Sequence, residues 1–338
     1  MSPDPIFPYV DGWRRVLSAP AIAAGGFVIT LLLALPLGYA MRGMLEAHLG
    51  RSTTAAAVAD GIEYDWWQEF TSQASGIGTT FTPAIIGAAT TLDNISGVLD
   101  GQAEIGPIAA ALGTWLAVWT FLAGGIIDRY ARQRRTGPDG FFAAGGVYFF
   151  RFLRLAALAG AIYWFLFAYV HEWLFTDWYV DLTRDMDTER RAFAVRLAFY
   201  LVFGALLLAT NLTFDYAKIR IVVENRRSAL AGVIAALRFL GRHPGPALGL
   251  YALNALTFLA LAGIWVLVAP VPGRAGLGLA LTFAAGQLYI LARLLLKLQF
   301  VASQTALFQS RLAHATYTAA PATRWPDSPG AETIAAGP

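Results

Sequence analysis

The sequence predicts an all-α protein that crosses a membrane six times. Of its 338 residues, 57% are hydrophobic and only 14% are charged, little more than half the charged share of a soluble domain. Several charge-free runs are about as long as a helix needs to cross the hydrocarbon core of a bilayer, roughly 20 residues. The basic residues are also distributed unevenly between the loops. Together these observations exclude a soluble enzyme and favour a polytopic helical bundle.

Six runs have the length of a spanning helix. Backbone amides must be paired within the segment where there is no water, so each run is expected to be helical. Arg14 and Arg15 precede the first run, but it exceeds the roughly 7 to 15 apolar residues of a secretory signal, and we expect an uncleaved anchor. The spans are expected at about residues 19–41, 105–127, 153–175, 195–217, 247–269 and 275–297.

A further uncharged run, residues 77–92, lies between the first two spans. It is short, rich in Gly and Thr, and interrupted by Pro83. We therefore expect an amphipathic or re-entrant segment there rather than a seventh span.

The loop charges predict the orientation of the bundle. With six spans, 18 Lys and Arg residues fall on the side of the two termini and 7 on the other side, whereas the acidic residues are distributed 8 to 14. The positive-inside rule then places both termini in the cytoplasm. We expect a multi-pass protein of a bacterial inner membrane.

Three segments that mix Arg with large apolar residues precede the first, third and fifth spans. Such segments can lie at the membrane surface while their arginines reach the headgroups. We therefore expect three hairpins, each introduced by a cytoplasmic amphipathic elbow helix, although chance similarity with ordinary basic flanks is the alternative. The three segments are residues 13–17, 150–154 and 237–242.

The rest of the chain is expected to form one external segment and a tail. Residues 42–104 are predicted to form helices along the outer surface, with Trp66 and Trp67 as interfacial anchors. Trp173 and Trp178 are expected to anchor the second external loop in the same way. Residues 1–312 are thus expected to form a single membrane domain, and residues 313–338, rich in Pro and small residues, a disordered cytoplasmic tail.

The sequence contains no motif for a cofactor or a structural metal. It has no cysteine, which excludes disulfides, thiolate nucleophiles and cysteine metal sites. A net charge of +3 does not indicate nucleic acid as a partner. Asp185, Asp187 and Glu189 could collect a hard cation, but Arg190 and Arg191 follow at once, and an acidic loop paired with its own arginines is the alternative.

The segment from Asn211 to Arg227 carries the most informative charges. If the fourth helix continues inward, Asp215 meets Lys218, Arg220 meets Glu224, and Glu224 meets Arg227 at helical spacing. This ladder would fix the depth of the helix in the membrane. A proton or ion path through Asn211 and Asp215 is the alternative.

The same stretch carries a resemblance. It is similar to a signature of uncharacterised bacterial six-helix integral membrane proteins, and to the membrane domain that accompanies some glycerophosphoryl diester phosphodiesterases. The resemblance implies a polytopic bundle with interfacial elbows and supplies no catalytic residues. It rests on Asp215-Tyr216-Ala217-Lys218, Glu224 and Ser228, followed by Arg238-Phe239-Leu240 and His243-Pro244.

Three functions are compatible with these observations. Without a catalytic motif, the leading hypothesis is a scaffold or subunit of a larger membrane assembly, with lipids and membrane proteins or a second copy as partners. A transporter or channel for a small solute would use the polar residues of the fourth span. A lipid-active enzyme would use external carboxylates and His171.

Overall fold

The computed structural model describes residues 5–50, 52–60, 63–81, 96–97, 99–101, 108–133, 137–268 and 276–312. All regular structure among these residues is helical. The expected tail, residues 313–338, and most of the uncharged run 77–92 lie outside the described residues.

The regular structure of the described residues is helical, which confirms the all-α class, and six of the described helices are long and apolar enough to cross a membrane, as many as the expected spans. They are α2 (Pro20–Leu49), α7 (Ala109–Arg132), α8 (Pro138–Phe165) with its continuation, α10 (Glu189–Val223), α12 (Pro244–Val268) and α13 (Gly276–Leu312). Two π-helical turns, η3 (Leu166–His171) and η4 (Trp173–Trp178), continue α8 into α9 (Tyr179–Thr183). The shorter helices are α1 (Ile6–Leu17), α3 (Ala55–Asp60), α4 (Tyr64–Gln73), η1 (Gly76–Thr80) and α11 (Ala229–Arg242).

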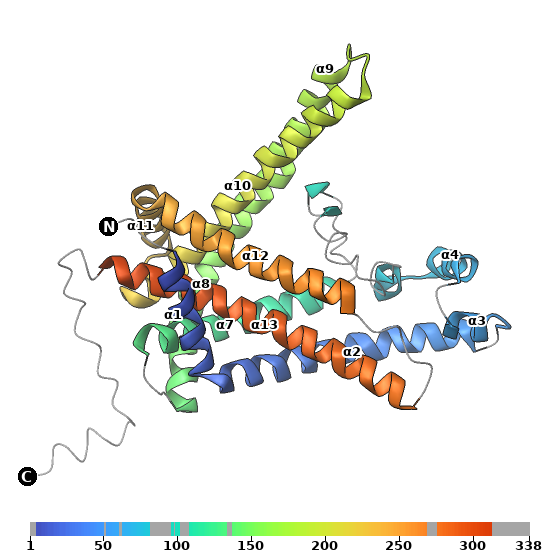
Figure 1. Cartoon of the computed structure of the whole chain (residues 1–338), viewed down its shortest axis with the longest axis horizontal. Coiled ribbons are helices and arrows are strands. Elements are labelled where there is room, and N and C mark those ends of the chain that lie inside the picture. The colour runs from blue at the N-terminus through green and yellow to red at the C-terminus, as the bar shows by residue number, and fades with distance from the viewer. Residues whose placement is uncertain are drawn as a thin grey trace, which may run out of the picture.

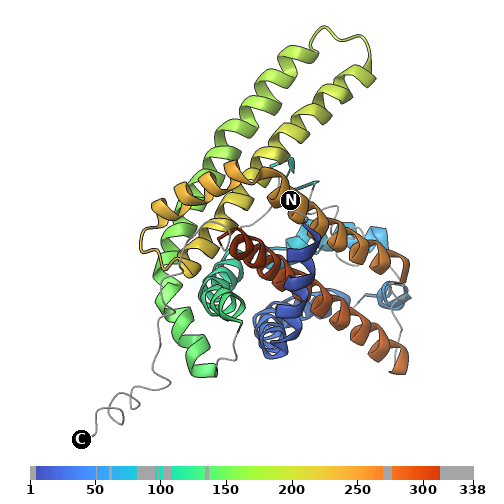
Figure 2. The ribbon, with the colours of Figure 1, turned by 60° about the vertical axis from the view of Figure 1, so that its left-hand side comes forward.

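The helices pack densely at one end of the molecule and diverge at the other. Figures 1 and 2 show that α8 and α10 form a long antiparallel hairpin, which projects away from α2, α7, α12 and α13. The two largest apolar clusters of buried residues lie where α1, α7, α8, α10, α11 and the second half of α13 meet. We call this end the charged layer, and it comprises residues 6–17, 128–133, 137–154, 215–243 and 297–312.

Helix α1 is fixed in the charged layer by polar contacts. The Arg15 guanidinium donates to the carboxylate of Asp11 at 2.8 Å, to the Tyr130 carbonyl at 2.9 Å and to Oε1 of Gln309 at 2.7 Å. Burial lowers the pKa of the Arg15 guanidinium, and the neighbouring Asp11 carboxylate offsets part of this shift. The guanidinium still keeps its charge, as it does in proteins generally. Gly12 lies directly against α13, where a Cβ would come within 2.8 Å of the Ser303 backbone nitrogen. Only glycine allows this close approach.

Helices α7 and α8 pack through small residues. A Cβ on Gly125 would lie 2.7 Å from the Phe141 carbonyl oxygen, and one on Gly145 would lie 3.0 Å from that of Phe121. Such close backbone contact is a common basis of helix association where apolar burial gives no driving force.

The turn between α10 and α11 redirects the chain along the charged layer. Asn225 has a left-handed conformation with φ of 50°, which ends α10. Ser228 then caps α11, since its side chain accepts a hydrogen bond from the Ala231 amide at 3.3 Å. Helix α11 buries Gly232, Val233, Ala236 and Phe239 and exposes apolar residues on its other side.

Two features differ from the expected boundaries. Segments 13–17 and 237–242 fall within the separate short helices α1 and α11, but segment 150–154 is part of the continuous helix α8 and forms no elbow helix. Helix α13 runs to Leu312, well beyond the expected end of the sixth span at residue 297. Its added turns are the most buried part of the helix.

The described part of the segment between the first two spans contains the short helices α3, α4 and η1. Glu63 caps α4 by accepting a hydrogen bond from the Trp66 amide at 2.6 Å. A further described piece, residues 99–101, reaches the hairpin: Nε2 of His171 lies 2.8 Å from the Leu99 carbonyl oxygen, and Tyr200 donates to Asp100. That hydrogen bond lowers the pKa of Asp100.

Candidate functional site

A cavity of about 320 Å³, lined by both polar and apolar side chains, lies between α7, α8, α10 and α13, at the border of the charged layer. We call it the lysine pocket. It contains both lysines of the chain, against 23 arginines elsewhere in the sequence. Its polar lining residues are Thr120, Tyr163, Asn211, Asp215, Lys218, Lys297 and Gln304. Its apolar lining includes Trp115, Leu116, Trp119, Ala156 and Ala159.

Asp215 and Lys218 form an ion pair on the α10 side of the lysine pocket. The Nζ of Lys218 lies 2.7 Å from Oδ1 of Asp215, and both side chains are partly exposed. On α13, Nε2 of Gln304 lies 3.4 Å from Oδ2 of Asp215. Gln304 itself is 2% exposed, so the packed centre of the bundle holds one side of the carboxylate in place.

Lys297 faces the opposite side of the pocket and has aromatic rather than anionic neighbours. Its Nζ lies 3.6 Å from the centre of the Trp119 ring and 4.2 Å from that of Trp115. The aromatic faces attract the ammonium group through the ring quadrupole, but they do not neutralise its charge. The Lys297 side chain is exposed in the cavity, so an oxygen ligand can reach it.

Asn211 and Tyr251 complete the polar side. Nδ2 of Asn211 donates to the Tyr251 hydroxyl at 2.9 Å. Asn211 lines the pocket one helical turn from Asp215.

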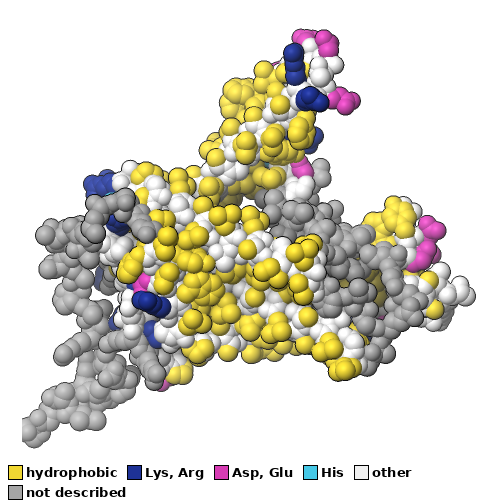
Figure 3. Space-filling view, in the orientation of Figure 1, with side chains coloured by type: hydrophobic (Ala, Val, Ile, Leu, Met, Phe, Trp, Pro, Cys, Tyr) yellow, Lys and Arg dark blue, Asp and Glu magenta, His cyan; other side chains and the backbone are white. Residues whose placement is uncertain are grey.

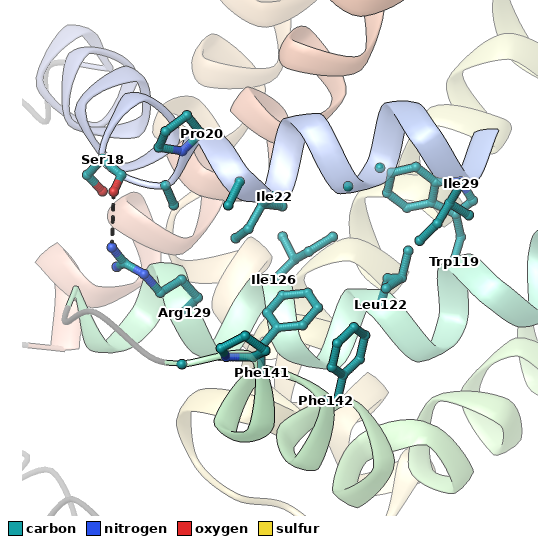
Figure 4. Close-up of a pocket in the computed structure, with 16 residues that line it drawn as sticks. Ser18, Pro20, Ile22, Ile29, Trp119, Leu122, Ile126, Arg129, Phe141 and Phe142 are labelled. Atoms are coloured by element: carbon teal, nitrogen blue, oxygen red, sulfur yellow. Dashed lines mark hydrogen bonds between the residues drawn. The ribbon is translucent and has the colours of Figure 1, made fainter. Parts of the chain in front are cut away.

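Trp119 separates the lysine pocket from a larger, apolar cleft. This second cavity, of about 520 Å³, lies between α2, α7 and the start of α8 (Figure 4). Ile22, Ile29, Leu122, Ile126, Phe141 and Phe142 line it, and Arg129 donates to the Ser18 carbonyl at 3.3 Å at one end. Trp119 and Ile126 line both cavities. The indole Nε1 of Trp119 is buried and has no hydrogen-bond partner among the described residues.

The charge ladder is present with one change. Asp215 pairs with Lys218 and Arg220 with Glu224, as the spacing predicts. Glu224 then binds Arg226 rather than Arg227, which is exposed. Helix α10 ends at Val223, so the helical spacing that would bring Arg227 to Glu224 no longer applies.

The other candidate residues lie far from the lysine pocket. Asp185, Asp187 and Glu189 are exposed at the hairpin tip, and no three potential metal ligands among the described residues come together. Trp173 and Trp178 are exposed on the hairpin and contact each other, with ring centres 4.2 Å apart.

Of the two tryptophans between the first two spans that are expected to be interfacial anchors, Trp66 is buried and Trp67 is partly exposed. Trp66 is 5% exposed and donates to Nδ1 of His48 at 3.0 Å, and Trp67 donates to the Phe81 carbonyl at 2.9 Å. Trp66 therefore contributes to a small aromatic cluster with Phe70 and Phe81.

Sequence reasoning identified the α10 side of the pocket but not its other walls. Asn211, Asp215 and Lys218 stood out because their charges and amide interrupt an apolar span. Lys297, Trp119 and Gln304 come from distant segments, and no local pattern connects them to α10. The one sequence signal that could have linked Lys297 to Lys218 is that they are the only lysines of the sequence, and both line this cavity.

Comparisons of this chain with protein-family models, curated proteins and solved structures find no match. The resemblance noted in the sequence and the role as an assembly subunit therefore stay predictions.

Proposed function

We propose that this protein binds an amphiphile with an anionic headgroup and that the lysine pocket holds the headgroup during its transport. The protein would lie in a bacterial inner membrane with both termini in the cytoplasm. In that orientation the lysine pocket lies at the level of the inner leaflet, with α1 and α11 along the membrane surface as elbows.

The charge of the pocket favours an anion. Lys218 is neutralised by Asp215, whereas Lys297 lies against two aromatic rings and has no ion-pair partner among the described residues. The pocket therefore carries one uncompensated positive charge in an environment where ionisable groups are costly and generally functional. An anionic group would supply the missing partner.

The adjoining cleft favours an amphiphile over a small hydrophilic anion. The cleft is lined almost entirely by apolar side chains and meets the lysine pocket at Trp119. An acyl chain in the cleft would remove apolar surface from contact with water while the headgroup stays near Lys297.

The proposal rests on one observation: Lys218 and Lys297 line the same cavity, which adjoins an apolar cleft. In the empty pocket Asp215 neutralises Lys218, and the indole faces stabilise the Lys297 ammonium. On binding, Lys297 would exchange a cation–π contact for a charge-assisted hydrogen bond, which is stronger. Asn211 and Gln304 would fix the orientation of the headgroup and of Asp215.

Titration of the purified full-length chain tests this proposal. The probe is dihexanoylphosphatidic acid in a neutral detergent, with dihexanoylphosphatidylcholine as the uncharged counterpart, and the readout is tryptophan fluorescence. We expect saturable binding of the anionic lipid alone. Lys297→Gln should weaken it about tenfold or more, the value of one lost charge-assisted hydrogen bond.

Arg293→Gln is the matched control. Arg293 lies one turn before Lys297 on α13, over the rings of Phe258 and Tyr289, and does not line the pocket. Equal weakening by both variants would indicate general attraction to a basic surface and would contradict the proposal. Equal binding of both lipids would contradict it as well.

A further inference from the structure

A third cavity, of about 490 Å³, lies between the end of α10, α11 and the end of α13, within the charged layer. It shares no lining residue with the lysine pocket. We call it the arginine pocket, because five arginines and a histidine line it and no carboxylate does: Arg220, Arg226, Arg238, Arg242, Arg311 and His243. Figure 3 shows Lys and Arg side chains gathered at this end of the molecule.

No carboxylate lies in this lining, whereas some arginines elsewhere in the charged layer are paired. Elsewhere in the charged layer, Asp11 pairs with Arg15 and Asp128 with Arg132, each at 2.8 Å. Glu224 pairs with Arg220 and Arg226 beside the arginine pocket, but it carries a single charge for two arginines. Arg238, Arg242 and Arg311 have no acidic partner among the described residues.

The three unpartnered arginines lie where their charges repel. Arg238 and Arg242 are four residues apart on α11, a spacing at which like charges destabilise a helix. Nε of Arg311 is buried and has no acceptor among the described residues. A buried donor without an acceptor costs free energy, and more so on a charged group. An anion in the cavity would relieve both penalties.

The pKa of the His243 imidazole is lowered by burial and by the same positive charges, those of Arg311 and Arg242. The lowered pKa favours the neutral form of His243, which can donate one hydrogen bond to an anion.

We propose that the arginine pocket binds a phosphate group, carried either by an anionic lipid headgroup or by a soluble phosphate compound. Guanidinium groups match phosphate oxygens in geometry and charge. Ile234 of α11 lines the cavity, and Leu230 and Leu237 are further exposed apolar residues of the same helix. An apolar helix surface in contact with the membrane would bring a lipid headgroup within reach.

The test compares the full-length protein with the double variant Arg238→Gln/Arg242→Gln. Both side chains are exposed and have no structural partner among the described residues, so the fold should be retained, as its melting temperature will show. The control is Arg190→Gln/Arg191→Gln, which removes the same charge from exposed residues at the hairpin tip. Arg311→Gln is an independent second variant.

Two probes distinguish the sources of the phosphate. Phosphatidylglycerol retained by the protein after transfer from mixed nanodiscs is counted by native mass spectrometry, and inorganic phosphate binding is followed by ³¹P NMR in neutral detergent. The double variant should bind the relevant probe about thirty-fold more weakly, since each surface arginine contributes roughly a five-fold factor. Arg311→Gln should act in the same direction.

The outcomes separate the alternatives. Loss of retained phosphatidylglycerol without phosphate binding identifies a lipid headgroup, and saturable phosphate binding without competition from the lipid identifies a soluble compound. If the double variant binds both probes as the wild type does, or if the hairpin control loses as much, the proposal is wrong. Because Lys218 and Lys297 are unchanged in these variants, failure here leaves the proposed function intact.

Discussion

The two halves of α13 have similar apolar residues in opposite environments. In the first half, Leu277, Leu281 and Leu288 are 76%, 60% and 66% exposed. In the second half, Leu298, Leu307 and Phe308 are each 1% exposed. Leucines in a membrane-spanning helix are thus no guide to its packed side.

Hydrogen bonds to other helices distinguish the buried half instead. Gln299 donates to the Tyr9 carbonyl at 2.8 Å, and Asn254 of α12 donates to the Ser303 hydroxyl at 3.1 Å. Lipid chains accommodate an exposed leucine as well as a protein core does, whereas a buried amide must find a partner. The lesson is that hydrogen-bonding residues, together with close glycine contacts, specify the association of these helices.

The largest effect is expected where a side chain would push α1 away from α13. Gly12→Val places methyl groups against the Ser303 backbone and should cost about 3 kcal/mol or prevent folding. Gly286→Val, in the exposed half of α13 where nothing lies within 4 Å, is the control and should leave the melting temperature nearly unchanged. Equal loss in both variants would refute the comparison.

Truncation of leucines tests the two halves directly. Leu298→Ala should destabilise the protein by about 2 to 3 kcal/mol, because it leaves a cavity in a packed region. Leu281→Ala should change stability by less than about 0.5 kcal/mol, since lipid fills the space. Unfolding in mixed micelles measures both, and similar losses would mean that the first half is also packed against protein.

Removal of a buried charge should have a smaller effect. Arg15→Gln leaves Asp11 unpaired and removes donors from Tyr130 and Gln309, at a cost of about 2 kcal/mol. Arg42→Gln breaks the exposed pair with Glu46 and should not change stability measurably. A large effect of Arg42→Gln would show that α2 packs against something at its far end.

The smallest effect concerns pH. The pKa of His243 is below its usual value near 6.5 in the folded protein, so the unfolded chain takes up the proton more readily. The stability from neutral His243 is therefore present above pH 6.5 and is lost as the pH falls through the lowered folded pKa. His243→Gln should show a shallower decrease in melting temperature between pH 7.5 and 5.5 than the wild type, and identical curves would contradict this.

The number of spans could be predicted from the sequence, because a charge-free run of about 20 residues has only one stable form in a bilayer. The extension of α13 could not, since Arg293 and Lys297 look like the end of a span. Of the lysine pocket, only the α10 residues could be identified, because Lys297 reaches it through tertiary packing. Glu224 pairs with Arg226 rather than with the expected Arg227 because the chain leaves the helix at the left-handed Asn225. No charge pattern indicates that turn.

In the proposed function, the lysine pocket and the apolar cleft together hold one amphiphile. Crystals grown in a lipid mesophase containing phosphatidic acid with brominated acyl chains test it most directly. We predict anomalous bromine signal in the cleft beside Trp119 and phosphate density between Lys218 and Lys297. Bromine signal confined to the outer surfaces of the helices, with only water between the two lysines, would contradict the account.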